Sequence, residues 1–377
     1  MAAKLSDVAK KAGCSVTTVS RVINNHGYLS QKTKDKVFAA MRELNYRPNS
    51  IARSLQGKKM KLVGLIFPEI TNPFFAELVQ DIETTLFQQN YKVILCNAGQ
   101  NKEKEREYLR MLQANQVDGI IAGAHNLGIN EYQQLGLPIV SFDRKLSDNV
   151  PIVSCDNYQG IKLAVHDLVQ AGCHKIYFLG NEHRKGNPTD ERLAAYLDEA
   201  KECHFSAHIR SVAFSDSSNI KNMKIHDMLV NDHPDGVVCT DDLTAVLVLQ
   251  EAKKLGIKVP KELKVIGFDG TKQIQTYHSE LSTIAQPIHD IATLLVKLLL
   301  TRIANPDEKL RQKNYILPVK LIKSETTAWK KAENRLFLLL KFSFLCHYLR
   351  NRSTFAIRLL SLHFVLAHQL ELINESE

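Results

Sequence analysis

The spacing of apolar residues near the start of the chain predicts two short helices separated by a tight turn. The first helix carries a stripe with i, i+3, i+4, i+7 spacing, formed by Leu5, Val8, Ala9 and Ala12. Gly13 supplies the permissive backbone that a tight turn requires. Ser15 is suited to cap the next helix, because its hydroxyl can accept a hydrogen bond from a free backbone N–H. This order is typical of a helix-turn-helix unit.

The second helix is expected to begin near Val16 and to have two distinct faces. The packing face holds Val19, Val22 and Ile23. The opposite face, which is free to meet DNA, holds Val16, Thr17, Ser20, Arg21 and Asn24.

Two further helices are expected before residue 60. The third has Ser30 as its cap, and its expected buried stripe is Val37, Phe38, Met41 and Leu44. Pro48 suits the first turn of a fourth, short helix that contains Ile51, Ala52, Arg53 and Leu55. Such helices could also form a small bundle with no role in binding.

The distribution of charge argues against a bundle without a binding role. Residues 1–60 hold 12 Lys and Arg against 3 Asp and Glu, a net charge of +9, whereas residues 61–327 hold 30 against 33, a net charge of −3. Basic side chains that neutralise phosphates release counterions and thereby drive binding to nucleic acid. A basic head on a near-neutral body therefore indicates a DNA-binding protein.

The same region resembles a known family of bacterial regulators. The pattern L-x-D-V-A-x-x-A-G-x-S-x-x-T-V-S-R-V-I-N, followed by N-Y-x-P-N-x-x-A-R-S-L, resembles the head of the LacI/GalR family over residues 5–57. The likeness continues to about residue 327. The runs NNHGYLSQKTKDKVFAAMRELNY, NQVDGIIAGAHNLG and PIVSFDR are most similar to sucrose-responsive members from Gram-positive bacteria.

The resemblance implies a role for each polar position of the head. Val16 and Thr17 would read base edges in the major groove, and Arg21 would contact a guanine. Phosphates would be held by Ser15, Thr18, Ser20, Asn24 and Thr33. Leu55 would wedge into the minor groove and kink the operator, with Arg53 beside it to neutralise phosphates. Each polar residue could instead face only solvent, and Leu55 could only pack one hinge helix on another.

Apolar runs beyond residue 61 predict a doubly wound α/β body. Buried parallel strands are expected at 62–67, 92–96, 119–123, 138–143, 175–180, 236–241 and 264–270. The body is too long for one core and should divide into two lobes. The resemblance implies a fold like periplasmic sugar-binding proteins, with an all-α head at 1–47, a hinge at 48–60 and a body at 61–327. Lobe one would hold 61–158 and 287–315, and lobe two 159–286 and 316–327.

Polar and aromatic residues near the ends of these strands form a candidate sugar site. Ligands of open α/β sheets bind beyond the carboxyl ends of strands. Carboxylates accept hydrogen bonds from sugar hydroxyls, an arginine donates them, and an aromatic ring covers the sugar face. The candidate effector-binding residues are Phe74, Phe75, Asp143, Arg144, Arg192, Phe214, Asp241 and Asp269. The resemblance also implies effector contacts for Arg192, Asp241, Asp269, Phe214, Asp143 and the region of Phe74. Asp242 is better interpreted as a helix N-cap.

Several other classes of protein are disfavoured. No G-x-S-x-G, P-loop or H-E-x-x-H motif is present, so we expect no catalytic residues, cofactor or metal. The seven Cys lack C-x-x-C spacing, which argues for reduced cytoplasmic thiols and against a zinc site or disulfide framework. The first residues lack the apolar core of a signal peptide, which disfavours a secreted sugar-binding module. We expect no membrane span and a cytoplasmic location, at the nucleoid through operator DNA.

The last fifty residues do not fit the family. Residues 328–377 form an atypical extension with a net charge of +3. Its apolar run at 336–349 is too short, and too interrupted by Lys341 and His347, to span a membrane. A non-functional extension is favoured over a helix that joins dimers into tetramers.

These observations predict a repressor of sugar utilisation. A homodimer, with a tetramer left open, would hold a palindromic double-stranded operator, one half-site per head. Sucrose or a related sugar would bind the body and release the DNA. The alternative is a catabolite-type regulator controlled by a co-repressor or a phosphorylated carrier protein.

Overall fold

The computed structural model describes residues 3–24, 26–47, 59–124, 126, 128–180, 187–306 and 312–328. The predicted hinge helix, with Arg53 and Leu55, lies outside the described residues, as does the C-terminal extension from residue 329 onward.

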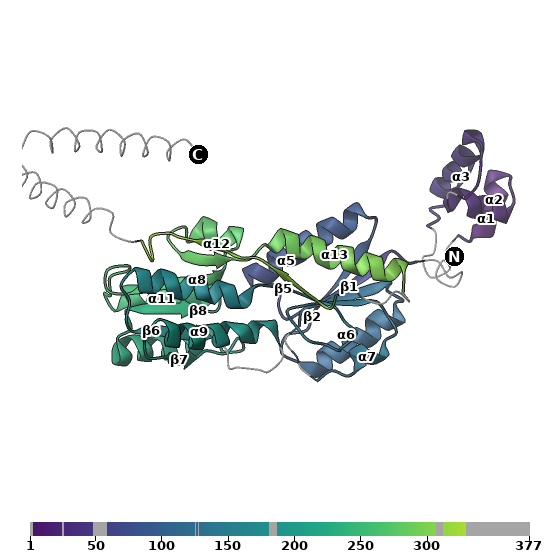
Figure 1. Cartoon of the computed structure of the whole chain (residues 1–377). Coiled ribbons are helices and arrows are strands. Elements are labelled where there is room, and N and C mark those ends of the chain that lie inside the picture. Colours follow the sequence, from purple (N-terminus) through teal and green to yellow (C-terminus); the bar gives the residue numbers. More distant parts are fainter. Residues whose placement is uncertain are drawn as a thin grey trace, which may run out of the picture.

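The head consists of three short helices around a small apolar core (Figure 1). They are α1 (Leu5–Ala12), α2 (Val16–Ile23) and α3 (Gln31–Glu43). Gly13 ends α1 in the left-handed conformation, with a φ of 64°, and this turn separates α1 from α2. The core is formed by Val8, Ala9, Ala12, Val19, Val22, Val37 and Ala40. The predicted helix-turn-helix therefore folds as expected.

One residue of the predicted α3 stripe was placed wrongly. Phe38 is 45% exposed, whereas Ala40, which was not in the predicted stripe, is buried. The inward residues of α3 are Val37, Ala40, Met41 and Leu44. This set has i, i+3, i+4, i+7 spacing, and Phe38 follows Val37 directly, so it is turned about 100° away from the core.

The first lobe of the body is built on a parallel sheet of six strands in the order β11-β5-β4-β3-β1-β2. The strands are β1 (Leu62–Phe67), β2 (Lys92–Asn97), β3 (Gly119–Ala122), β4 (Ile139–Phe142), β5 (Ile152–Cys155) and β11 (Asn314–Leu317). The helices of this lobe are α5 (Pro73–Gln88), α6 (Lys102–Ala114), α7 (Glu131–Gln134) and α13 (Ile288–Ala304).

Strand β1 shows why this sheet is covered on both faces. Leu65 and Phe67 belong to the core cluster that includes α5 and α13, whereas Ile66 belongs to the cluster beneath α6. Side chains alternate across a strand, so two apolar faces each need a covering layer. Gly64 allows the close approach of α6, because a Cβ there would lie 2.5 Å from a methyl carbon of Leu112.

The second lobe has a six-stranded sheet in the order β12-β10-β9-β8-β6-β7, in which β12 runs antiparallel to β10. The strands are β6 (Ile176–Gly180), β7 (His208–Ser211), β8 (Gly236–Cys239), β9 (Lys264–Asp269), β10 (Ser282–Ala285) and β12 (Lys320–Ile322). The helices are α8 (Asn157–Gln170), the 3-10 turn η1 (Pro188–Asp190), α9 (Glu191–Glu202), α10 (Ser218–Asp227), the π-helical turn η2 (Met228–Asp232), α11 (Asp242–Lys254) and α12 (Lys272–Tyr277).

The chain passes between the two lobes three times: after β5, after β10 and after β11. The third crossing comes later than the predicted boundary between residues 315 and 316. That boundary lies inside β11, because Ile316 and Leu317 still pair with Ser154 and Cys155 of the first sheet. The predicted boundary at 158 lies in the first turn of α8, which packs on the second lobe.

In the part of the chain that the structure describes, none of the helices combines the length and the apolar character needed to cross a lipid bilayer.

Candidate DNA-binding head and effector cleft

The first turn of α2 presents its expected base-reading residues to solvent. Val16 is 45% exposed, which is unusual for an apolar side chain with three buried valines nearby, and Thr17 is also exposed. Ser15 caps the helix, since its Oγ accepts a hydrogen bond of 3.1 Å from the N–H of Thr18. The cap fixes the start of α2 and thereby the direction of both side chains.

Four of the residues that are expected to contact phosphates are half-buried polar side chains near this turn and at the start of α3. Thr18, Ser20 and Asn24 are half-buried, and the Asn24 side-chain amide donates to the Ser20 carbonyl at 2.7 Å. Thr33 occupies an equivalent place at the start of α3, where its Oγ1 lies 2.8 Å from the capping Oγ of Ser30. Thr18 and Thr33 lie in the first turns of α2 and α3, where backbone N–H groups attract anions, whereas Asn24 is the C-cap of α2.

Arg21 is exposed on α2 and lies against the following loop. Its Nε donates to the carbonyl of His26 at 3.3 Å. Gly27 makes room for this side chain: it has a φ of +74°, and a Cβ there would lie 2.5 Å from Arg21 Nη2. Gly27 was not identified from the sequence, although glycine in a predicted loop was the signal for it.

All eight candidate effector residues line one cavity of about 110 Å³ between the two lobes. Lobe one contributes Phe74, Phe75, Asp143 and Arg144, and lobe two contributes Arg192, Phe214, Asp241 and Asp269. Asp143 and Asp241 follow β4 and β8 closely, and Asp269 ends β9. The cavity therefore lies at the carboxyl ends of parallel strands, as open α/β sheets predict.

The aromatic side of the cavity is held by the start of α5. Asn72 caps this helix by accepting a hydrogen bond of 2.9 Å from Phe74 N–H, and Pro73 occupies its first turn. Phe74 contacts Phe142 with ring centroids 5.5 Å apart. Phe75 contacts Phe214 of the other lobe edge-on at 6.2 Å, so aromatic packing spans the cleft.

Arg192 is buried at the centre of the site and is fixed by three contacts. Its Nε donates to Asn157 Oδ1 at 2.6 Å, and its Nη1 donates to the carbonyl of Thr240 at 2.5 Å. Its guanidinium carbon lies 3.7 Å from the centre of the Phe268 ring, in a cation–π contact. This rigid geometry leaves the guanidinium ready to donate to a ligand.

Two carboxyl groups of the cavity, Asp143 and Asp269, have unusual backbone and protonation properties. Asp143 has a φ of 54° and Asp269 a φ of 132°, conformations that cost free energy and cluster at functional sites. Burial raises the pKa of Asp143, against the opposing effect of Arg192 and Arg144. Burial, and then the Asp242 carboxylate, raise the pKa of Asp269 well above its usual value.

A polar bridge connects the two lobes at the rim of the cavity. Arg144 Nη1 donates to the hydroxyl of Thr189 in η1 at 2.9 Å and to the carbonyl of Asp143 at 3.2 Å. Deeper in the cavity, Gln286 donates to Asp269 Oδ1 at 2.8 Å. Its other amide atom, Oε1, is buried and has no protein partner among the described residues, so it is available to a ligand hydroxyl.

Asp241 lines the cavity, where it was predicted to lie, and it also caps α11, the role that was predicted for Asp242. Asp241 caps α11, because its Oδ1 accepts from Thr244 N–H at 2.7 Å, and it also lines the cavity. Asp242 is buried and accepts from Gly270 N–H at 2.8 Å and from the Thr283 hydroxyl at 2.6 Å. The interpretation of Asp242 as the cap was wrong by one residue, since the strand ends at Cys239 and the helix begins at Asp242.

The sequence did not reveal several other residues that line the cavity. These are Asn72, Phe142, Thr189, Asp190, Leu193 and Gln286. Asn72 carried the clearest signal, because an Asn followed by Pro is typical of the start of a helix, and α5 does begin at Pro73.

The comparisons with known proteins agree with this arrangement. A model of bacterial regulatory proteins of the lacI family matches residues 4–49, and one of a periplasmic binding protein-like domain matches residues 165–327. The sucrose operon repressor of Pediococcus pentosaceus is 56% identical over 326 residues, which is 86% of this chain and all of that protein. The sucrose operon repressor of Streptococcus mutans is 47% identical over 329 residues, again 86% of this chain and all of the relative.

A solved structure shares the whole architecture. The crystal structure of the lac repressor dimer bound to operator and the anti-inducer ONPF has a TM-score of 0.74 and 26% identity, and the match covers 87% of this chain and 99% of that one. Members of this family are regulators and not enzymes. The chain belongs to the LacI family of bacterial regulatory proteins.

Proposed function

We propose that this protein represses a sugar-utilisation operon and releases its operator when a sugar binds between the lobes. The observation that carries the proposal is one cavity in which four aspartates, two arginines and five phenylalanines meet, in a chain whose helix α2 also exposes Val16 and Thr17 in its first turn. It would act in the bacterial cytoplasm, where the operator DNA lies.

The chemistry of the cavity supports a neutral sugar as the ligand. Asp143, Asp241 and Asp269 supply acceptors for hydroxyl groups, and Arg192 supplies donors. The names of the two close relatives support sucrose, or another fructose-containing sugar, as the effector. The cavity of about 110 Å³ is smaller than the usual 300–1,000 Å³ or so of ligand pockets. A disaccharide would therefore enter only as the lobes separate or the phenyl rings shift.

The alternative of a carrier-protein-controlled regulator has less support. Control by a phosphorylated protein would need a basic surface on the body, such as α13 could provide. Only Lys297 is an exposed cation on this helix, because Arg302 is half-buried and its pKa is lowered by burial. One exposed cation is a weak basis for recognising a phosphorylated partner.

On the DNA, we propose that two heads of a homodimer each occupy one half-site of a palindrome. Val16, Thr17 and Arg21 would read bases, and Ser15, Thr18, Ser20, Asn24 and Thr33 would hold phosphates. Leu55, with Arg53 beside it, would wedge into the minor groove between the half-sites. A tetramer would require an added contact from residues 328–377, which we do not propose.

The sugar site is tested by Asp269→Ala. We expect the variant to bind operator as the wild type does and to lose sugar-induced release, because it removes an acceptor from the cavity. Operator affinity with and without sucrose is measured by fluorescence anisotropy. Asp148→Ala, which removes an exposed carboxylate paired with Lys145 at 3.2 Å, is the control and should respond normally. A normal sugar response in Asp269→Ala would refute the assignment.

The wedge is tested by Leu55→Ala. We expect specific operator binding to weaken by tenfold or more, while salt-sensitive binding to random DNA is largely retained, because wedging acts only at the specific site. Titrations of both DNAs at two salt concentrations separate the effects. An equal loss on the two DNAs would reject the wedge.

A further inference from the structure

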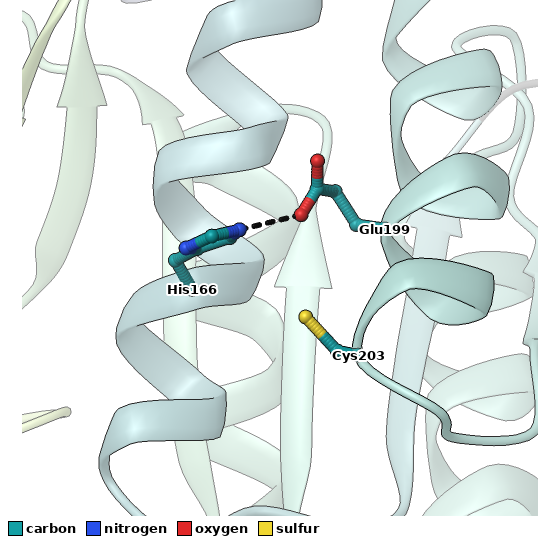
Figure 2. Close-up of side chains that lie close together, drawn as sticks. All are labelled: His166, Glu199 and Cys203. Atoms are coloured by element: carbon teal, nitrogen blue, oxygen red, sulfur yellow. Dashed lines mark hydrogen bonds and ion pairs between the residues drawn. The ribbon is translucent and has the colours of Figure 1, made fainter.

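Away from the effector cleft, three side chains of different chemistry converge between α8 and α9. His166 lies on α8, Glu199 lies on α9, and Cys203 is the C-cap of α9. Their ligand atoms, one nitrogen, one oxygen and one sulfur, all lie within 4.8 Å of one another. Figure 2 shows the three side chains pointing toward one another in the space between the helices.

Glu199 is the centre of this group and is completely buried. Its two oxygens have different partners: Oε2 lies 2.6 Å from His166 Nε2, and Oε1 lies 2.8 Å from Lys162 Nζ. A buried carboxylate is costly unless positive charge or hydrogen bonds compensate it. The negative charge is thus fixed in place before any ion arrives.

The group lies on a polar seam that joins the two helices. At four-residue spacing, Tyr158, Lys162 and His166 of α8 face Asp198, Glu199 and Glu202 of α9. The helices run parallel, since Asn157 and Arg192 meet near their N-terminal ends. His166 and Glu199 lie about two turns farther along, outside the effector cavity. Cys203 adds a sulfur ligand only at this end of the seam.

The ligand types favour zinc over the common hard cations. Zinc accepts imidazole nitrogen, carboxylate oxygen and thiolate sulfur at about 2.0–2.3 Å, whereas calcium and magnesium select oxygen. Ligands of a tetrahedral ion at those distances lie roughly 3.3–3.8 Å apart. The distance between His166 Nε2 and Glu199 Oε2 is 2.6 Å. It would grow by less than about 1 Å when the ion takes the place of the proton between these two atoms.

We propose that His166, Glu199 and Cys203 form a zinc-binding site on the second lobe. Glu199 coordinates through Oε2, and Lys162 stays on Oε1 as an outer partner that orients the carboxylate. Cys203 coordinates as thiolate, its proton and the proton that lay between His166 Nε2 and Glu199 Oε2 pass to solvent, and water fills the fourth position. The His166 side chain is 41% exposed, which gives the ion a path from solvent. The ion would fasten together the helices that hold Arg192 in the cleft.

Metal titration of the full-length, tag-free protein tests this site. After chelator treatment and reduction by a phosphine, Co²⁺ is added and the near-ultraviolet thiolate-to-cobalt charge-transfer band is recorded; Zn²⁺ then displaces the cobalt. We expect one such ion per chain. His166→Gln and Cys203→Ser should each weaken binding at least tenfold, and Cys203→Ser should abolish the charge-transfer band.

Three matched variants locate the ion. Cys14→Ser, Cys346→Ser and His174→Gln remove a thiol or an imidazole elsewhere and should leave the titration unchanged. Circular dichroism and operator binding confirm that His166→Gln and Cys203→Ser remain folded. Absence of a thiolate–cobalt band in the wild type, unchanged binding in folded Cys203→Ser, or loss of the ion in Cys346→Ser would each overturn the proposal.

Discussion

At the scale of single residues, Asp242 links the parts of the sugar site in lobe two without lining it. It follows the cavity residue Asp241, it accepts from Gly270 N–H next to Asp269, and it reaches Thr283 on β10. Burial raises its pKa to about 6, partly offset by the hydrogen bonds from Thr283 and Gly270. A carboxyl group in this position holds two strand ends and one helix start at fixed separations.

The raised pKa makes a testable contribution to stability. The folded protein binds this proton more tightly than the unfolded chain, whose ordinary value is 3.8. The protonated Asp242 carboxyl group therefore stabilises the folded protein fully below pH 3.8, and this stabilisation is lost as the pH rises through about 6. Asp242→Asn keeps the shape without the charge. We expect its unfolding free energy, relative to wild type, to rise by on the order of 1 kcal/mol or more from pH 4 to pH 7.

Urea unfolding followed by circular dichroism at several pH values measures this difference. Asp148→Asn, which changes an exposed carboxylate, is the control and should differ from wild type by a constant amount. A pH-independent difference for Asp242→Asn would show that Asp242 is not the group that titrates.

The acidic site residues that the sequence revealed share one property. Asp143, Asp241 and Asp269 stand at the ends of apolar runs, and parallel strands bring such ends to one edge. Gln286 also follows a strand, but that strand, β10, was not predicted, and Thr189 lies in the 3-10 turn η1, whose path depends on tertiary packing. The cap was assigned to Asp242 instead of Asp241 because identical neighbours differ only in the direction that the backbone gives them.

At the scale of elements, position in the sheet separates much of what could be predicted from what could not. Each of the seven predicted strands overlaps an observed one, since continuous apolar runs mark doubly buried strands. Five strands were missed, β5, β7, β10, β11 and β12, and three of them, β7, β11 and β12, lie at sheet edges. In β11 the side chains alternate between exposed and half-buried, because it lies at a sheet edge and lacks a continuous apolar run.

Loss of the Ser15 cap of α2 should lower the affinity for operator DNA. Ser15→Ala removes the Oγ that accepts from Thr18 N–H, which costs about 1 kcal/mol of helix stability. The helix start would fray and misplace Val16 and Thr17. We expect operator affinity to fall by roughly fivefold or more, since 1 kcal/mol is about a factor of five.

Ser217→Ala is the matched control for this change. Ser217 caps α10 in the body by accepting from Ile220 N–H, and α10 is not part of the head. Its loss should leave operator affinity unchanged. Equal affinity of Ser15→Ala and wild type would contradict the role of α2 as the base-reading helix.

At the scale of the whole molecule, a basic head is attached to a body in which a cavity spans two lobes. Phe75 and Phe214 pack across the cavity, and Arg144 reaches Thr189 from one lobe to the other. A ligand that changes these contacts changes the arrangement of the two lobes. Ligand binding in the cavity then alters the affinity of the head for DNA, by an amount set by the coupling free energy between the two sites. The charge pattern predicted the head. The position of the third crossing between the lobes was not predicted correctly, because it depends on the pairing of β11 with β5.

The most direct test of the account is operator release by sugar. The labelled DNA is a palindrome with a central CG step, selected from a randomised pool, and anisotropy is recorded at fixed salt with sucrose, fructose, glucose and their phosphates. The account predicts tight binding without sugar and a loss of affinity of tenfold or more with sucrose or a related fructose-containing sugar. Tight binding that none of these sugars alters would contradict it.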